Sequence, residues 1–276
     1  MLSGGRLLGQ GLYGCVFTSP LSCIREKGKA KDALPALSKL TEEDEAALEM
    51  SVADRVRRIP LWRNYFAVAE SMCSPSKKQT EKDLDECSVL QEKPLSSFRV
   101  LRMAYAGTPL TEYVVDFKTF QPMRFITHLL EAGSLLTLFG MVHRDLHYGN
   151  VVVDHHQVPR IIDFNLAIPI QTKTHDLENM VMHQYDYRIA HEPPDSTLLM
   201  AVAHGKRIDH VIHLMVTKKS VLRKLRTITH QSESDMERQL EDVAQEATVR
   251  DGDARAWFRA HWRTIDSWGI GIMIVD

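Results

Sequence analysis

The sequence predicts an α+β protein with a small strand-rich N-terminal part and a larger, mostly helical C-terminal part. Up to about residue 105, short apolar segments with strand character surround a single helical segment. From about residue 106, apolar residues recur at helical spacing in several segments. A chain of 276 residues has enough material for a substantial core, in one large domain or in two lobes. We therefore expect two lobes, residues 1–105 and 106–276.

Composition narrows the class of protein. The chain is 44% hydrophobic and 25% charged, which is typical of globular proteins, and its net charge of −2 gives no basic field for nucleic acid. No apolar run reaches the ~18 residues that span a bilayer, and the N-terminus lacks the apolar core of a signal peptide. We expect no nucleic-acid or membrane partner. The chain has four cysteines, and they show neither C-x-x-C spacing nor a dense disulfide framework. We therefore expect them to be reduced thiols of an intracellular protein: Cys15, Cys23, Cys73 and Cys87.

The N-terminal part begins with "RLLGQGLYGCVFTSPL", which predicts two strands joined by a glycine turn. A polar loop follows, and then "TEEDEAALEMSVADRVRRI" predicts a helix with acidic residues in its first turn. Thr41 is the expected cap, and Arg57 and Arg58 stand near the helix end. The segments "YFAVAESMC" and "SFRVLRMAYAG" predict further strands.

The C-terminal part contains "FITHLLEAGSLLTLFG", which predicts a helix ending at Gly140. After two short apolar strands comes a polar segment, residues 169–195. Two helical stretches follow, "LLMAVAHGKRIDHVIHLMVTKKSVLRKL" and "SDMERQLEDVAQEATV", and the chain closes on the apolar "DSWGIGIMIVD".

The first turn carries a glycine motif. "GQGLYGCV" matches G-x-G-x-x-G-x-V through Gly9, Gly11, Gly14 and Val16, and glycines let a backbone approach phosphates closely. A dinucleotide-binding turn uses the same glycines but opens a helix. Here "CVFTSP" continues as a strand, which favours a hairpin folded over nucleotide phosphates. A plain hairpin with glycine at its turn is the alternative.

A second motif joins three polar residues in the centre of the chain. "HRDLHYGN" places Asp145 and Asn150 five residues apart, and Asp163 follows thirteen residues later in "IIDF". We expect the intervening hairpin to bring Asp163 back beside the loop that carries Asp145 and Asn150. In phosphoryl transfer, positioned charge does most of the catalytic work. Asp145 would accept the proton of a substrate hydroxyl, and Asn150 and Asp163 would hold Mg²⁺ on ATP phosphates. Turn residues that cap buried strands are the alternative for any one of them.

These motifs together resemble those of eukaryotic-type protein kinases, and in detail the serine/threonine kinases of large nucleocytoplasmic DNA viruses. The resemblance covers most of the chain, in the order "LGQGLYGCVF", "SKL", "RMAYAG", "HRDLHYGN", "IIDF", "EPPD" and "DSWGIG". It implies a two-lobed kinase fold and transfer of the γ-phosphoryl group of ATP to serine or threonine of a protein substrate, with Mg²⁺ or Mn²⁺. It also implies location in the host cytoplasm or the virion.

The resemblance implies roles for further residues. Nucleotide contacts would come from the glycine loop, including Gln10, and from the hinge in "RMAYAG", with Met103 as gatekeeper and Ala104 to Ala106 offering backbone groups to adenine. Asp266 of "DSWGIG" would anchor the backbone of the catalytic loop. Arg144 could pair with a phosphate on the activation segment, for which the acceptors are Thr172, Thr174, Tyr185 and Tyr187.

The phosphate-binding lysine and its partner have to be chosen without a V-A-I-K motif. Lys39 is our choice, because it ends an apolar stretch just before the helix, whereas residues 27–31 are a solvated lysine run. Glu45 and Glu49 fall on the same helix face as Leu48, so periodicity cannot choose between them. The distance to "RRIP" in the resemblance favours Glu49.

The sequence also departs from the kinase pattern. Asn165 stands where Gly usually follows Asp-Phe, and we expect it to adopt the left-handed backbone region that Asn tolerates. His147 replaces a common lysine, and Asp195 replaces Glu in "HEPPD". An insertion at about residues 196–262 precedes Asp266, and the C-lobe is truncated after the apolar helix.

Two other functions share this fold. A pseudokinase or ATP-binding scaffold is favoured by Asn165 and the short C-lobe, and disfavoured by the complete set of polar motif residues. A small-molecule phosphotransferase shares the spelling D-L-H-x-x-N, but the long segment between "IIDF" and "HEPPD" is typical of a platform for a protein substrate.

Overall fold

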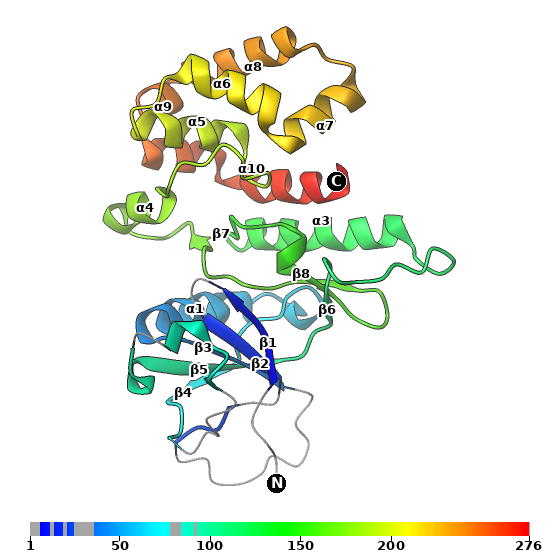
Figure 1. Cartoon of the computed structure of the whole chain (residues 1–276), viewed down its shortest axis with the longest axis vertical. Helices are drawn as coiled ribbons and strands as arrows, with labels where there is room; N and C mark the ends of the chain where they lie inside the picture. Colours follow the sequence, from blue (N-terminus) through cyan, green and yellow to red (C-terminus); the bar gives the residue numbers. More distant parts are fainter. Residues whose placement is uncertain are drawn as a thin grey trace. The chain divides into compact units, whose positions relative to one another are not determined.

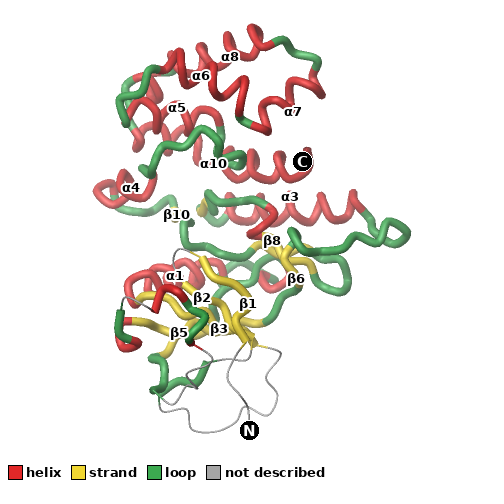
Figure 2. Tube along the Cα trace, in the orientation of Figure 1, coloured by secondary structure: helices red, strands yellow, loops and turns green. Residues whose placement is uncertain are grey.

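The structure is a computed structural model that describes residues 6–11, 14–18, 21–24, 36–77, 84–90 and 93–275. The chain forms two compact units. The first comprises Met1–Thr108 and Val152–Asn165, and the second comprises Pro109–Val151 and Leu166–Asp276. The first holds the large sheet and the second most of the helices, so the protein is α+β (Figures 1 and 2). Residues 152–165, expected in the second lobe, belong instead to the first unit.

The first unit is built on a five-stranded antiparallel sheet with the order β1-β2-β3-β5-β4. Helix α1 (Glu43–Val56) follows β3 directly. The strands are β1 (Arg6–Gly11), β2 (Gly14–Thr18), β3 (Ala36–Glu42), β4 (Ser71–Cys73) and β5 (Phe98–Ala104). Short 3₁₀ turns are η1 (Trp62–Asn64), η2 (Ser88–Leu90) and η3 (Leu95–Ser97). A smaller sheet has the order β6-β8-β9, with β6 (Thr108–Pro109), β8 (Val151–Val153) and β9 (Pro159–Ile161).

Alternation along β2 separates the two faces of this sheet. Cys15 and Phe17 belong to a buried apolar cluster on one face, together with Leu40 of β3 and Val100 of β5. Because successive side chains of a strand point to opposite faces, Val16 lies on the other face, where its register partner is Lys39. The register of β2 and β3 thus sets the glycine hairpin beside the lysine.

Two expected details of the first unit are wrong. Thr41 does not cap α1, because β3 continues through Glu42 by pairing with β5, and Thr41 is a buried strand residue opposite Arg99. The strand expected over "YFAVAESMC" is limited to β4. Its first part turns to another partner, since Phe66 bridges Ile161 and the Ala67 amide donates to the carbonyl of Ile161 at 3.0 Å.

The expectation of reduced thiols is also wrong. Cys15 is bonded to Cys87, and Cys23 to Cys73. Both pairs have a Cα–Cα distance of 5.9 Å, inside the usual range for disulfides. The partners are 72 and 50 residues apart in the chain, so local spacing gave no sign of the pairing.

The second unit is mostly helical, with helices α5, α6, α8 and α10 contributing to one buried apolar cluster. Its helices are α3 (Pro122–Leu138), α4 (Thr174–Val181), α5 (Pro194–Ala203), α6 (Ile208–Lys218), α7 (Ser220–Thr229), α8 (Glu233–Gln245), α9 (Ala247–Arg250) and α10 (Ala254–Val275). Strands β7 (Met141–Val142) and β10 (Ile168–Pro169) pair, and η4 spans Tyr148–Asn150. No helix within the described ranges is long and apolar enough to cross a bilayer.

Glycines with positive φ mark where two of these helices stop. Gly140, at φ 68°, follows α3 where the sequence predicts a helix end. Gly205, at φ 63°, follows the end of α5, and a second break at Lys219 separates α6 from α7, so the first long helical stretch after the polar segment is three helices rather than one. The apolar "DSWGIGIMIV", residues 266–275, is the second half of α10.

Candidate active site

The first unit contains a cavity of about 320 Å³ between the sheet, α1 and residues 162–165. Ligand pockets are typically ~300–1,000 Å³, so the volume suits a small molecule. Apart from Tyr105, the residues that we expected to contact nucleotide line this cavity, as does Asp163: Gly9, Gln10, Gly11, Gly14, Val16, Lys39, Glu49, Met103, Ala104 and Ala106. Residues from five separate segments of the chain therefore converge on one space.

Lys39 is the centre of the polar contacts in this cavity. Its Nζ donates to Glu49 Oε2 at 2.9 Å, to Asp163 Oδ1 at 3.1 Å and to Asn165 Oδ1 at 3.1 Å. Burial alone would lower the pKa of Lys39, but the carboxylates of Glu49 and Asp163 outweigh it and raise the pKa. The cavity therefore contains a charged lysine whose ammonium group is positioned by three hydrogen bonds.

The choice between Glu45 and Glu49 is resolved by the buried stripe of α1. Ala46, Glu49 and Ala53 are buried, whereas Glu45 is partly exposed and Leu48 is exposed. The stripe that faces the sheet therefore passes through Glu49 and leaves out Leu48, which we had placed on it. The sequence periodicity alone did not show which side of the helix is buried, because that depends on its contacts with the sheet.

The left-handed backbone conformation that we expected at Asn165 occurs at Asp163 instead. Asp163 has φ 61°, the left-handed region that few non-glycine residues adopt, whereas Asn165 is not among the residues with positive φ. Asn165 instead directs its side-chain oxygen to Lys39. The residue in place of glycine thus adds a third acceptor for the lysine, and the backbone turn occurs two residues earlier.

The end of the cavity near Ala104 and Ala106 is fixed by residues that the sequence analysis missed. Gly107 has φ 140°, and a Cβ there would lie 2.3 Å from the carbonyl oxygen of Val153. Arg160 donates to the carbonyl oxygen of Ala106 at 3.3 Å and to Asp154 at 2.9 Å. A glycine after an apolar strand was the available sign of a close backbone approach, but nothing in the sequence linked Arg160 to this end of the cavity.

The second unit contains a separate polar cluster around Asp145. Asn150 Nδ2 donates to Asp145 Oδ2 at 2.9 Å and to the Asp145 carbonyl at 2.8 Å. His191 Nε2 lies 2.8 Å from Asp145 Oδ1, and His147 Nε2 lies 3.7 Å from the same oxygen. Burial opposes ionisation, but hydrogen bonds from His147 and His191 outweigh it and hold the pKa of Asp145 far below its ordinary value. Asp145 is therefore a carboxylate near neutral pH.

The same cluster brings three possible metal ligands within 4.8 Å of one another: Asp145, His147 and His191. The Gly149 amide, however, donates to His147 Nδ1 at 3.0 Å. In a neutral imidazole this places the proton on Nε2, facing Asp145, so His147 acts as a hydrogen-bond donor there. His191 was absent from the expected site, although its position just before "EPPD" was the available signal.

The backbone before Asp145 is held by a buried carboxylate of α10. Asp266 accepts from the amide of His143 at 2.8 Å and from the amide of Arg144 at 2.9 Å. These bonds support Arg144 at φ 71°, a region unfavourable for its side chain. Gly269, one turn on, leaves room for Leu146, whose carbonyl oxygen would be 2.7 Å from an added Cβ. The contact of Asp266 is the one that the resemblance implied.

Arg144 does not offer a free site for a phosphate. Its guanidinium donates to the carbonyl oxygens of Met180 and Val181, the latter at 3.0 Å, and lies 3.2 Å from His183 Nδ1. These bonds tie the guanidinium to the end of α4. Of the four expected acceptors, the side chain of Thr174 lies outside the described side chains, and Thr172, Tyr185 and Tyr187 are partly buried.

The "HEPPD" segment joins the expected insertion to the rest of the second unit. Glu192 is buried and lies 2.8 Å from His183 Nε2, and its carbonyl accepts from Lys219 at 3.0 Å. Asp195 accepts from Trp257 Nε1 at 2.9 Å. Lys219 and Trp257 come from residues 196–262, so the insertion contributes to the core of this unit.

The predicted metal ligands divide between the units, Asn150 in the second and Asp163 in the first. No protein-family model matches the chain, and no curated protein matches it either.

Proposed function

We propose that the protein is an ATP-dependent protein kinase of the eukaryotic type that phosphorylates serine or threonine. The observation that carries the proposal is the contact of Lys39 with Glu49 and Asp163 in a cavity lined by the glycine strands. A fixed, charged lysine is what binding of nucleotide phosphates requires, and a glutamate on the adjacent helix is what fixes it. In this reading the first unit is the small lobe and the second, mostly helical unit is the larger lobe.

The cavity residues fit a nucleotide. Gly9 and Gly11 carry no side chain that would keep phosphates from the backbone, and an added Cβ at either would meet nothing within 4 Å. Val16 and Met103 supply apolar surface for a base, while Lys39, the register partner of Val16, supplies a cation that lines the cavity. ATP supplies the phosphoryl group, with Mg²⁺ or Mn²⁺ to neutralise its charge, and the carboxylate of Asp163 would be a metal ligand contributed by the first unit.

Asp145 is the residue assigned to the substrate hydroxyl. Its low pKa keeps it ionised, and Asn150 orients one of its oxygens. A carboxylate held in this way can accept the proton of a serine or threonine hydroxyl as phosphoryl transfer proceeds. The backbone bonds of Asp266 to the two preceding residues keep the loop in place.

One observation favours the second candidate, a pseudokinase or ATP-binding scaffold. Both oxygens of Asp145 already have partners, Asn150 on one and His191 on the other. A substrate hydroxyl would have to share or displace the contact of His191. A small-molecule phosphotransferase is the weaker reading, because residues 166–190 form a long segment of the second unit that includes β10 and α4.

The test is transfer of radiolabelled phosphate from ATP to generic protein substrates with Mg²⁺ or Mn²⁺. We expect transfer by the wild-type chain and a severe loss in Lys39→Met. Lys93→Met is the matched control, because Lys93 is an exposed lysine that pairs with Glu42. Nucleotide binding without transfer would support the scaffold instead. Equal transfer by Lys39→Met and wild type would refute the assignment of the lysine.

A further inference from the structure

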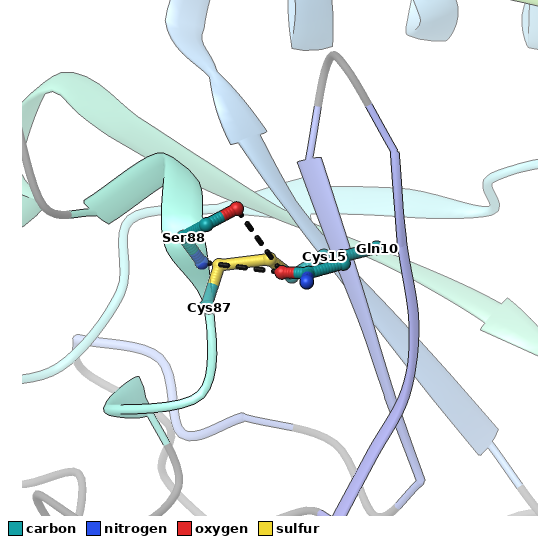
Figure 3. Close-up of a disulfide and its surroundings, with 4 residues drawn as sticks. All are labelled: Gln10, Cys15, Cys87 and Ser88. Carbon is teal, nitrogen blue, oxygen red and sulfur yellow. Dashed lines mark hydrogen bonds between the residues drawn. A yellow bond between two sulfur atoms is a disulfide. The ribbon is translucent and has the colours of Figure 1, made fainter.

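Two consecutive residues, Cys87 and Ser88, are each bonded to one strand of the glycine hairpin. Gln10 of β1 and Cys15 of β2 are direct partners in the hairpin register. Cys15 is bonded to Cys87, and Gln10 Oε1 accepts from the amide of Ser88 at 3.2 Å and from its hydroxyl at 3.1 Å. Figure 3 shows these two connections side by side. We call this arrangement the hairpin clamp.

The clamp joins strands that line the cavity to Cys87 and Ser88, which do not line it. Gln10 and Gly14 line it, whereas the Cys15 side chain lies in the buried cluster on the opposite face of the sheet. In the segment of described residues 84–90, backbone bonds run from Cys87 to Leu84 at 2.9 Å and from Leu90 to Cys87 at 3.2 Å. Between these described residues and the hairpin, the disulfide and the bonds to Gln10 are the specific links, in addition to apolar packing.

We propose that the Cys15–Cys87 disulfide is a reversible redox site that controls nucleotide affinity, reacting with a dithiol reductant. The dithiol donates two electrons and two protons. The S–S bond breaks, Cys15 and Cys87 become thiols, and the dithiol becomes its own disulfide. Both sulfur-bearing residues are buried, at 0% and 1% exposure, so the reductant reaches them when the segment around Cys87 lifts from the sheet.

The expected direction follows from conformational entropy. While the disulfide is intact, Gln10 and the strands around it are ordered before nucleotide binds. After reduction, Cys87 and Ser88 can leave the hairpin, Gln10 loses its partner, and binding has to order the hairpin again. Reduction should therefore weaken nucleotide binding. By reciprocity, nucleotide should favour the disulfide over the dithiol by the same factor.

The second disulfide supplies a matched control. Cys23 and Cys73 join the start of the chain to β4, and neither they nor their neighbours in sequence line the cavity. Its loss removes a disulfide of the same unit and leaves the hairpin clamp in place. A general effect of thiol chemistry would appear equally in both variants, whereas an effect of the clamp would follow Cys15 and Cys87.

The experiment measures the Kd of a fluorescent ATP analogue for the full chain, oxidised and then treated with dithiothreitol, after mass spectrometry has verified both disulfides. We expect Kd to rise by about five- to tenfold on reduction, within the usual range of coupling between sites. Cys15→Ser/Cys87→Ser should have the higher Kd with or without reductant, and Cys23→Ser/Cys73→Ser should respond as the wild type does. In a dithiothreitol redox buffer, the analogue should shift the thiol–disulfide equilibrium of Cys15 and Cys87 by the factor seen in Kd.

Equal Kd values before and after reduction would overturn the proposal, and so would a response that follows Cys23 and Cys73. The inference rests on the proposed function, and hydrogen exchange separates the two. No analogue binding in either state would overturn the nucleotide site. In that case faster amide exchange of residues 6–11 and 14–18 on reduction would still support the clamp, and unchanged exchange would overturn it. If a serine variant fails to fold, wild-type protein still gives the Kd and the amide exchange before and after reduction, and mass spectrometry identifies which disulfide has been reduced.

Discussion

Replacing Asp266 by alanine should destabilise the second unit more than any ordinary helix-surface change. The carboxylate is buried and accepts two backbone hydrogen bonds, from His143 at 2.8 Å and from Arg144 at 2.9 Å. Alanine leaves both amides without this acceptor, in a place where water does not replace it. The positive φ of Arg144 then also loses its support.

The magnitude can be worked from these contacts. A buried donor left unsatisfied costs about 1–3 kcal/mol, so two donors cost about 2–6 kcal/mol. Part of this loss is offset. Burial raises the pKa of Asp266, which means that the buried carboxylate itself has an unfavourable desolvation energy, and alanine removes that energy. We expect a net loss of about 2–4 kcal/mol in the free energy of unfolding.

Asp253→Ala is the matched control. Asp253 also accepts two backbone hydrogen bonds, from Arg255 at 3.1 Å and Ala256 at 3.0 Å, but it is exposed at the start of α10. Its loss should cost about 1 kcal/mol, as for a helix cap. Urea unfolding of both variants gives the comparison, and amide exchange of His143 and Arg144 gives a local reading. An Asp266 variant no less stable than the Asp253 variant, with both amides still protected, would refute the reasoning.

Three further predictions concern other parts of the site and core. Asp145→Asn should bind nucleotide nearly normally by calorimetry, while phosphate transfer falls by about 10²–10⁴; full transfer would remove Asp145 from the mechanism. Burial lowers the pKa of Lys219 from 10.5 to about 8, so between these pH values the unfolded chain holds a proton that the folded chain has released. From this residue the unfolding free energy should rise with pH by up to about 1.4 kcal/mol per pH unit. Lys219→Met should lack that rise in urea unfolding at pH 8, 9 and 10, and parallel curves would contradict the assignment. Gly107→Ala should weaken nucleotide binding, because its Cβ would overlap the backbone of Val153; unchanged calorimetric affinity would show that the cavity end is not fixed there.

The sequence predicted what depends on short spacing. The glycine hairpin, the helix after it and the loop of Asp145 and Asn150 are each encoded within a few residues, and each forms within the expected segment. The α+β division followed from the change in periodicity near residue 105. Lys39 was chosen because it stands just before a helix. In the structure Lys39 lies in β3, which leads directly into α1, and it lines the cavity.

What the sequence could not predict depends on partners far along the chain. Thr41 has the chemistry of a helix cap, but pairing with β5, more than fifty residues away, keeps it in a strand. The two disulfides depend on how the sheet folds, and no spacing rule pairs Cys15 with Cys87. Lys219 reads as one of several lysines at the end of a helix, yet it is fully buried against the carbonyl of Glu192.

Local spacing and long-range contacts act on the same residues. The motif around Asp145 is local, but its backbone is fixed by Asp266, more than a hundred residues further on. Likewise Asp163 belongs to a short local motif, while its carboxylate is fixed by Lys39, 124 residues away in sequence. Local spacing therefore determines which functional groups are present, and long-range contacts determine where each group points. A variant that removes a long-range anchor should for this reason alter the loop of Asp145 although every residue of that loop is intact, and Asp266 is the place where that separation can be measured.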